Sequence, residues 1–385
     1  MNFDVVIIGG GLVGASLAAA LESSGLAIAL VEAQSSVEPS DDWDNRIYAI
    51  SPGSRRFLET SGIWSSLDNG RIAAVEEMRV CGDTGSELHF SAYQMGVPEL
   101  ACILENRVLQ HALWQKLLQQ ENLTLFHPAS CAALKFGPDY AGLTLADGSV
   151  LNAKLVVGAD GRNSWVRNQA GISAAPLDYQ QHGVVANFSC ELPHRGVAYQ
   201  WFQPDSILAL LPLPGNRVSM VWSVSPEKSA HLLGLENGNL AREVDAAAQH
   251  VLGSLSCITA PASFPLRLLT LPHITAQRLA LIGDAAHNMH PLAGQGVNTG
   301  FRDARQLAQL LIERGAVTDC GDAQLLRQYE RKRKEDIYSM QTTTYALKHL
   351  FNNDVPLLRS VRNLGLAAAN TLVPFKKLLM RHALD

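Results

Sequence analysis

The chain has 385 residues, of which 47% are hydrophobic and 17% are charged, and its formal net charge is −5. A chain of this length and composition can bury a large core and is expected to divide into two or more domains. The acidic balance, together with the lack of any stretch that interleaves basic and aromatic residues, argues against a nucleic-acid partner.

The cysteines and the N-terminal apolar run indicate the cellular compartment of the protein. Six cysteines lie at irregular spacings without a C-x-x-C pair, so we expect reduced, mostly buried thiols and no zinc site. The run Val5–Leu21 is broken by glycines, is too short to span a membrane, and is not preceded by any basic residue. We therefore expect no signal peptide and a cytoplasmic protein. The cysteines are Cys81, Cys102, Cys131, Cys190, Cys257 and Cys320.

The N-terminal segment predicts a strand, a tight turn, a helix and a second strand. Asp4–Ile8 reads as the first strand and Gly9–Gly11 as the turn. Leu12–Ser24 is compatible with a helix, and Ala27–Val31 is apolar again. This order is typical of a βαβ unit in a parallel sheet.

The turn of this unit has the spacing Gly9-x-Gly11-x-x-Gly14, which lets backbone N–H groups approach a pyrophosphate. Glu32, at the end of the second strand, is placed to accept hydrogen bonds from ribose hydroxyls. The motif favours FAD and NAD about equally, and a glycine-rich turn without a ligand is the alternative. The residues expected beside it at the cofactor are Leu12, Val13 and Ala33.

Two later apolar runs also end in glycine-bearing loops. Leu155–Gly158 precedes Asp160-Gly161, and Leu279–Ile282 precedes Gly283-Asp284. Each reads as a strand that leads toward a helix. Three strand ends are thus predicted to carry loops of similar character.

Residues 177–271 contain alternating, β-rich runs, which we interpret as a mostly antiparallel sheet forming a second domain. Residues 76–99 share this β-like character and are expected to join that domain. A discontinuous cofactor-binding domain is then expected at 1–75, 100–176 and 272–340, followed by amphipathic helices at 341–385. The β-rich runs are Gly183–Cys190, Val197–Phe202, Ile207–Leu211 and Val218–Val224.

The region after the third strand is the most informative. It reads Gly283-Asp284-Ala285-Ala286-His287, followed by His290-Pro291-Leu292-Ala293-Gly294-Gln295-Gly296-Val297-Asn298-Thr299-Gly300-Phe301-Arg302-Asp303. This stretch resembles the signature of the class A flavoprotein monooxygenases, and specifically that of the UbiH/UbiF/VisC ubiquinone-biosynthesis hydroxylases. Gly158–Arg167 is similar to the aspartate-glycine motif of the same family.

The resemblance implies the fold class of p-hydroxybenzoate hydroxylase. This is an α/β fold with an FAD-binding Rossmann-like domain of the glutathione-reductase type, an inserted, mostly antiparallel β-sheet substrate domain and a C-terminal helical tail. It also implies that the protein uses FAD, O₂ and, as a transient co-substrate, NAD(P)H. Because no second G-x-G-x-x-G follows a strand, NAD(P)H is expected to lack a Rossmann domain of its own.

The implied activity is hydroxylation of the aromatic ring of a polyprenylated phenol in ubiquinone biosynthesis, through a C4a-hydroperoxyflavin. The alternatives are hydroxylation of another aromatic substrate, a prenyl reductase, and a flavin-bound assembly factor that works with other ubiquinone-biosynthesis proteins. Halogenation is disfavoured because the first lysine of the chain is Lys116, far beyond the first cofactor segment.

The same resemblance assigns residues along the FAD. Arg46 and Arg107 match family arginines, with ordinary surface arginines as the alternative. Asp284 is expected to accept hydrogen bonds from the ribitol hydroxyls. A helix beginning near Asn298 is expected to direct N–H groups at the flavin N1/C2=O edge and to stabilise the charge of the reduced ring. The other expected contacts are Asp160, Gly161, Gly283, Pro291, Gly294, Gln295, Gly296 and Val297.

No side chain is predicted to be the catalytic acid or base, because the flavin carries the chemistry. Four side chains of the second domain could bind a phenol, although a structural role is favoured for each; they are Tyr179, His182, His194 and Tyr199. His287 and His290 with Asp284 have metal-like spacing, but we expect no metal because such ligands would compete with the flavin.

The C-terminal tail differs in charge from the rest of the chain. From Met340 onward, six basic and two acidic residues give a net charge of +4, and apolar residues recur at helical spacing. Such a tail predicts peripheral attachment to an anionic membrane surface, at the inner face of the membrane. The alternative is a helix packed against the FAD-binding domain.

Overall fold

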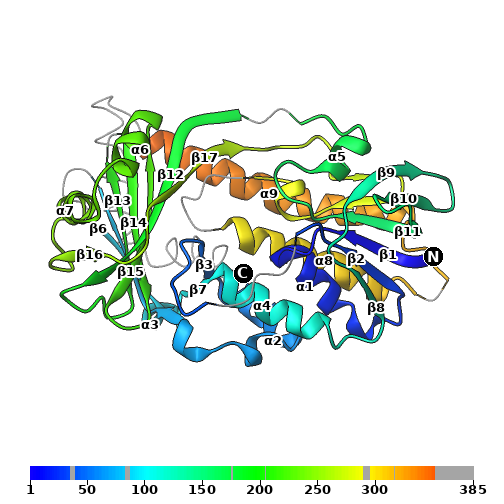
Figure 1. Cartoon of the computed structure of the whole chain (residues 1–385), viewed down its shortest axis with the longest axis horizontal. Coiled ribbons are helices and arrows are strands. Elements are labelled where there is room, and N and C mark those ends of the chain that lie inside the picture. The colour runs from blue at the N-terminus through cyan, green and yellow to red at the C-terminus, as the bar shows by residue number, and fades with distance from the viewer. Residues whose placement is uncertain are drawn as a thin grey trace.

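A computed structural model describes residues 1–34, 40–82, 87–174, 177–203, 205–288, 295–315 and 317–351, with side chains described up to residue 342. Figure 1 shows an elongated molecule with a sheet-rich lobe at one end and a mixed helix and sheet lobe at the other. Helix α9 (Ala323–Phe351) runs along its length.

The mixed lobe is built on an eight-stranded sheet in the order β18-β19-β11-β1-β2-β8, with β10 and β9 continuing from β11. Strand β1 pairs in parallel with both β2 and β11, and β11 pairs in parallel with β19. These strands are continuous apolar runs because both faces of a central parallel sheet are covered. The bounds are β1 Asn2–Ile8, β2 Ile28–Val31, β8 Leu123–Phe126, β9 Cys131–Phe136, β10 Ala141–Leu145, β11 Val150–Gly158, β18 Thr275–Ala276 and β19 Leu279–Leu281.

The first helix is shorter than the sequence predicted. α1 covers Leu12–Ala20 and gives way to a 3₁₀ turn, η1, at Glu22–Ser24, before Gly25 adopts a left-handed φ of +70°. A left-handed residue ends a helix at little cost when it is glycine. The other helices of this lobe are α2 Pro52–Thr60, α4 Asn106–Leu117, α5 Trp165–Gln169 and α8 Gly296–Glu313, with short 3₁₀ turns η2 Trp64–Ser66, η3 Asn69–Arg71 and η4 Gly283–Ala285.

The other lobe contains a second eight-stranded sheet in the order β16-β12-β15-β14-β13-β5-β6, with β17 paired to β12. All its pairings are antiparallel except the parallel pair β5 and β13. Strands β5 and β6 therefore lie in the same sheet as the strands found between residues 177 and 268. The bounds are β5 Glu77–Cys81, β6 Glu87–Ser91, β12 Leu177–Cys190, β13 Val197–Gln203, β14 Ser206–Leu213, β15 Arg217–Val224, β16 Leu255–Cys257 and β17 Ala262–Leu268.

One face of this sheet, the outer face, is covered by helices α6 (Pro226–Leu233) and α7 (Asn237–Ala247). A small third sheet connects the two lobes at the opposite face. It consists of β3 (Ile47–Ile50), β7 (Ala101–Glu105) and β4 (Ala73–Val75), and short helix α3 (Ala92–Met95) lies nearby. Ile47 and Ala49 of β3 pack with Ala198 and Leu213 of the large sheet.

All six cysteines carry free thiols. Burial raises the pKa of the Cys102 and Cys190 thiols to about 11. Among the residues that the structure describes, no helix combines the length and apolar character needed to cross a bilayer.

Candidate functional site

The first glycine loop is shaped by close backbone packing at Gly9 and Gly14. Gly9 has a φ of +107°, and a Cβ there would lie 2.4 Å from the Ala159 carbonyl oxygen. A Cβ on Gly14 would lie 2.0 Å from the Gly9 carbonyl oxygen. Both glycines are therefore required by the fold itself, because they bring α1 against the ends of β1 and β11.

Gly11 and Gly296 have no such requirement. A Cβ on either would meet no atom of the described residues within 4 Å, and neither residue has a left-handed φ. Gly11 precedes the first residue of α1, and Gly296 is the first residue of α8. Each helix N-terminus thus opens onto space that the described residues leave free, as a bound pyrophosphate or ring would need.

The Gly10 peptide is fixed from both sides. Its carbonyl accepts hydrogen bonds from Gln110 Nε2 at 2.6 Å and Trp114 Nε1 at 3.0 Å, both on α4. Its N–H donates to Glu32 Oε2 at 2.6 Å, while Glu32 Oε1 accepts from the Gln34 N–H at 2.8 Å. Glu32 therefore supports the loop directly, in addition to its predicted contact with ribose.

The Asp160-Gly161 segment lies beside this loop. Asp160 Oδ2 accepts from the Val166 N–H at 3.0 Å and so holds the start of α5. Asp160 Oδ1 is buried and has no partner among the described residues, which leaves it available to a cofactor or water. A guanidinium nitrogen of Arg167 donates to the Ala285 carbonyl at 3.0 Å and joins this segment to the third one.

The third segment also meets the first. A Cβ on Gly300 would lie 2.5 Å from a Val13 methyl group, and one on Gly283 would lie 3.3 Å from the same methyl. Asp284 is half-buried on this turn. Because β1, β11 and β19 are adjacent and parallel, their carboxyl ends bring all three segments to one edge of the sheet, where α/β proteins bind nucleotides.

Asn298 fixes the N-terminal end of α8 against β3. Its Oδ1 accepts from the Ser51 N–H at 2.9 Å, and its Nδ2 donates to the Ala49 carbonyl at 2.8 Å. The helix begins at Gly296, two residues before the predicted start, and Gln295 and Val297 flank that first residue. Pro291 and Gly294, and also His290, lie outside the described residues.

The two predicted arginines differ in environment. Arg46 is exposed, and its Nε donates to the Tyr48 hydroxyl at 2.8 Å. Arg107 is the second residue of α4, and its backbone N–H donates to Asp44 Oδ2 at 3.3 Å. Burial raises the pKa of Tyr48, and the charge of Asp284 adds to this rise against the opposing effect of Arg46, so its phenol stays protonated.

Tyr48 was missed from the sequence, although residues i and i+2 of a strand share a face and Arg46 was already a candidate. The Asp44 backbone that precedes Arg46 is held by Glu105 and Asn187. The Asp44 N–H donates to Glu105 Oε1 at 2.6 Å, and its carbonyl accepts from Asn187 Nδ2 at 2.9 Å. This segment therefore contacts both lobes.

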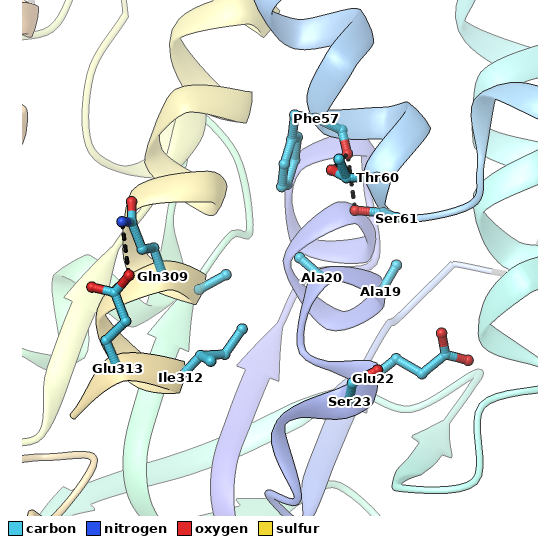
Figure 2. A pocket seen from close by; sticks show the side chains of 11 residues that line it. Ala19, Ala20, Glu22, Ser23, Phe57, Thr60, Ser61, Gln309, Ile312 and Glu313 are labelled. Carbon is cyan, nitrogen blue, oxygen red and sulfur yellow. Dashed lines mark hydrogen bonds between the residues drawn. The ribbon is translucent and has the colours of Figure 1, made fainter. Parts of the chain in front are cut away.

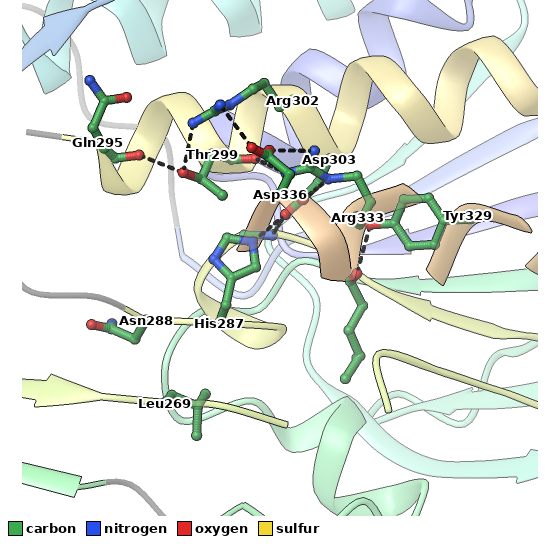
Figure 3. A network of polar contacts seen from close by, with 12 residues as sticks. Leu269, His287, Asn288, Gln295, Thr299, Arg302, Asp303, Tyr329, Arg333 and Asp336 are labelled. Atoms are coloured by element: carbon green, nitrogen blue, oxygen red, sulfur yellow. Dashed lines mark hydrogen bonds and ion pairs between the residues drawn. The ribbon is translucent and has the colours of Figure 1, made fainter. Parts of the chain in front are cut away.

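Figure 3 shows a cluster of charged side chains around Asp303, which is hydrogen-bonded to the Gly283-Asp284 turn. Asp303 is fully buried, and its Oδ2 accepts from the Gly283 N–H at 2.8 Å and lies 2.6 Å from His287 Nε2. Its Oδ1 accepts from Arg333 Nε at 2.6 Å. His287 is therefore committed to Asp303, and no group of three potential metal ligands occurs in the described part of the chain.

The large sheet presents small apolar side chains on its inner face, opposite α6 and α7. Cross-strand pairing places Gln200 beside Ala209, Ala209 beside Val221, and Val221 beside Val185. Val185, Ala209 and Val221 are only half-buried, whereas Gln200 is 5% exposed. The face thus offers an apolar surface bordered by the Gln200 side chain.

Two of the four phenol-binding candidates have structural roles. Tyr199 belongs to the outer-face core and stacks on Trp201 with ring centroids 5.6 Å apart. His194 Nε2 lies 2.9 Å from the Leu213 carbonyl and 2.8 Å from the Gly215 carbonyl in a turn. Because residues alternate between the faces of a strand, Gln200, next to Tyr199, faces inward.

A surface cavity of about 370 Å³ lies between α1, α2 and α8 (Figure 2). Ala19, Gln309 and Glu313, which line it, belong to the C-terminal ends of α1 and α8. The predicted cofactor contacts Gly11 and Gly296 lie at the opposite, N-terminal ends of α1 and α8. Helix C-termini carry partial negative charge, so this cavity is unsuited to a pyrophosphate.

Comparison with known proteins agrees with this arrangement. A family profile described as an FAD-binding domain matches residues 2–343. Ubiquinone hydroxylase UbiL of Rhodospirillum rubrum is 38% identical over 388 residues, which cover 99% of this chain and 89% of that protein. The 3-demethoxyubiquinol 3-hydroxylase of Escherichia coli K12 is 36% identical over 386 residues, covering 99% of this chain and 98% of the relative.

A solved structure shares the fold at lower identity. The crystal structure of p-nitrophenol 4-monooxygenase PnpA from Pseudomonas putida DLL-E4 matches with a TM-score of 0.81 and 18% identity, covering 100% of this chain and 99% of that one.

Proposed function

The chain belongs to the FAD-binding-domain family that includes the ubiquinone-biosynthesis hydroxylases, and from this premise we propose that it hydroxylates the ring of a polyprenylated phenol in that pathway. It is an FAD-dependent aromatic-ring monooxygenase that takes electrons from NAD(P)H and oxygen from O₂. The fold class inferred from the sequence is confirmed by the family match and the shared fold.

The observation that carries the proposal is the convergence of three segments at one sheet edge, with space at Gly11 and Gly296 that the described residues leave open. We propose that α1 and Gly11 receive the pyrophosphate, that Glu32 binds ribose, and that Asp284 binds the ribitol chain. The N-terminus of α8 would then lie near the pyrimidine end of the ring, where its dipole would favour negative charge. The flavin, once reduced, supplies the oxygenating chemistry.

The inner face of the large sheet is the proposed substrate surface. It faces β3, the strand to which Asn298 ties the N-terminus of α8. Val185, Ala209 and Val221 would pack against an aromatic ring, and the Gln200 amide would bind one of its oxygen substituents. No hydrogen bond of the Gln200 side chain occurs within the described residues, which supports a role toward a ligand.

Turnover by the purified holoprotein tests the activity. NAD(P)H consumption should require a prenylated phenol, and mass spectrometry should find one oxygen from ¹⁸O₂ in the product. A product that gains hydrogen without oxygen would identify a reductase. Bound FAD that is never reduced with any prenylphenol present would favour the assembly-factor alternative.

Adjacent variants on β13 test the substrate surface. Gln200→Leu should raise KM about threefold to tenfold, the value of one lost hydrogen bond, and leave FAD binding intact. Tyr199→Phe, on the outer face, is the matched control and should leave KM unchanged. Equal effects of the two changes would contradict the assignment of the inner face.

We also propose that residues 341–385 attach the protein to an anionic membrane surface, where a polyprenyl substrate resides, and that neighbouring biosynthetic proteins assemble there. The net charge of +4 from Met340 onward supports this attachment. Flotation with anionic liposomes tests it. Replacing Lys376, Lys377 and Arg381 by glutamate should abolish flotation, and unchanged flotation would exclude the charged tail as the anchor.

A further inference from the structure

We propose that Asp303 and Arg333 are positioning residues for the flavin: their buried ion pair fixes the Gly283-Asp284 turn and sets how tightly reduced FAD is held relative to oxidised FAD. Neither side chain is among the expected cofactor contacts, so the pair acts through the turn that it supports.

The geometry shows how the turn is held (Figure 3). A single carboxylate receives the Gly283 N–H at 2.8 Å, contacts His287 at 2.6 Å and accepts from Arg333 at 2.6 Å. Asp303 comes from α8 and Arg333 from α9, while Gly283 and His287 belong to the turn after β19. Three segments distant in sequence are thus fixed at one group beside Asp284.

The cluster extends to a second acidic residue. Arg333 donates to Asp336 at 2.7 Å, and Arg302 donates to the same carboxylate at 3.1 Å. Arg302 also donates to the Thr299 hydroxyl at 3.2 Å, in the first turn of α8. The charges of the two acidic and two basic side chains therefore cancel within the cluster, leaving His287 out of the count. Each of the four side chains is largely buried.

The charge states are held by the cluster itself. Burial would raise the pKa of Asp303, but His287 and Arg333 outweigh it and lower that pKa below its ordinary value. Burial opposes the charge of Arg333, yet Asp303 and Asp336 raise its pKa. The ion pair consequently stays charged through neutral pH, and removing one partner leaves an uncompensated charge in a poorly solvated region.

Removing either charge is therefore predicted to change the binding of reduced FAD relative to oxidised FAD, in opposite directions for the two residues. Reduced flavin carries a negative charge that the oxidised form lacks. Asp303→Asn removes a negative charge and should tighten reduced FAD relative to oxidised FAD. Arg333→Met removes a positive charge and should do the reverse. The double variant should restore the wild-type balance.

The experiment measures dissociation constants of oxidised and reduced FAD from each protein, in air and under anaerobic reduction. The dissociation constant of oxidised FAD divided by that of reduced FAD should rise about tenfold for Asp303→Asn and fall about tenfold for Arg333→Met, as expected for one uncompensated charge. A tenfold change corresponds to about 30 mV for a two-electron couple. Both variants are repeated in a His287→Gln background, so that residue 303 no longer contacts an imidazole.

Asp336→Asn is the matched control for the turn, because Asp336 contacts Arg333 and Arg302 but not Gly283. Because it also removes a negative charge, it should raise the ratio of the two dissociation constants, as Asp303→Asn does. It should keep the affinity for oxidised FAD within about twofold of the wild-type value. Asp303→Asn should weaken that affinity by about tenfold, because the turn loses its carboxylate.

Two results would overturn the proposal. One is a ratio that moves in the same direction in Asp303→Asn and Arg333→Met, or not at all, since a purely structural role predicts no dependence on sign. The other concerns the double variant, Asp303→Asn with Arg333→Met. This protein buries no uncompensated ion, so it can be measured even if a single variant fails to fold. Wild-type affinity for oxidised FAD in that protein would show that the pair does not position the turn.

Discussion

The two ends of the proposed flavin site are built in different ways. The Gly9–Gly14 loop is shaped by contacts between backbone atoms, with a missing Cβ at Gly9 and Gly14 allowing a strand and a helix to touch. The Gly283-Asp284 turn is instead held by a buried carboxylate of α8, Asp303, which accepts from the Gly283 N–H and forms an ion pair with Arg333 of α9.

This difference has an energetic consequence. The glycine loop depends mainly on steric fit, and a single carboxylate, Glu32, accepts a hydrogen bond from it, so no buried ion pair is needed to hold it. A turn held by a buried ion pair depends on both partners at once, since either charge alone is costly in the protein interior. The first region should therefore respond to changes in side-chain volume, and the second to changes in charge.

The largest expected effect follows from breaking the ion pair. Arg333→Met should lower the free energy of unfolding of the apo-protein by about 3–5 kcal/mol, because Asp303 is left charged and buried. Lys332→Met changes the neighbouring exposed position and is the control. Urea denaturation measures both, and equal stability of the two variants would show that the pair contributes nothing.

The loss of stability in Arg333→Met should depend on pH and should become smaller in acid. The pKa of Asp303 is lowered in the folded protein. Its contribution to stability is therefore fully present above the unfolded value, about 3.9, and is lost as the pH falls through the lowered folded pKa. The stability gap between the wild type and Arg333→Met should accordingly narrow in acid.

A smaller loss is expected at Gly14. Gly14→Ala places a methyl group against the Gly9 carbonyl and should destabilise the apo-protein by about 1–3 kcal/mol. Because the cause is steric, the loss should be the same at low and high salt. A strong dependence on salt or pH would contradict a packing origin.

The smallest effect on stability is expected at Gly11. The methyl group of Gly11→Ala meets no atom within 4 Å in the part of the chain that the structure describes, so this change should alter the free energy of unfolding by less than about 0.5 kcal/mol. The methyl group would nevertheless obstruct a pyrophosphate and should weaken FAD binding about tenfold, measured by fluorescence titration of the apo-protein. Unchanged FAD affinity would remove Gly11 from the proposed cofactor site.

The sequence predicted most of what depends on local pattern. The three strand-to-loop segments, the βαβ unit and the β-rich region were all expected, and their strands occur with boundaries shifted by a few residues. The FAD assignment is supported by the family match. The domain limits and the individual cofactor contacts remain predictions, and those at Pro291 and Gly294 lie outside the described residues.

Alternation along a strand is visible in the sequence, but which face of the sheet looks inward is not. Gln200 and Tyr199 are adjacent, and only the register of β13 with β14 and the packing of α6 and α7 show which one faces the other lobe. The sequence drew attention to Tyr199 for its chemistry. The fold places it in the outer core and leaves Gln200 inside.

The sequence by itself indicated the fold class, through its resemblance to a known family, and the character of the first cofactor loop, because the strand, turn and helix of that loop are consecutive in the chain. Only the tertiary structure decided that Asp303 meets Arg333, thirty residues later, and that Asn298 ties α8 to β3. Such pairings depend on how separate elements pack, and no periodicity in the chain encodes the partner of a buried charge.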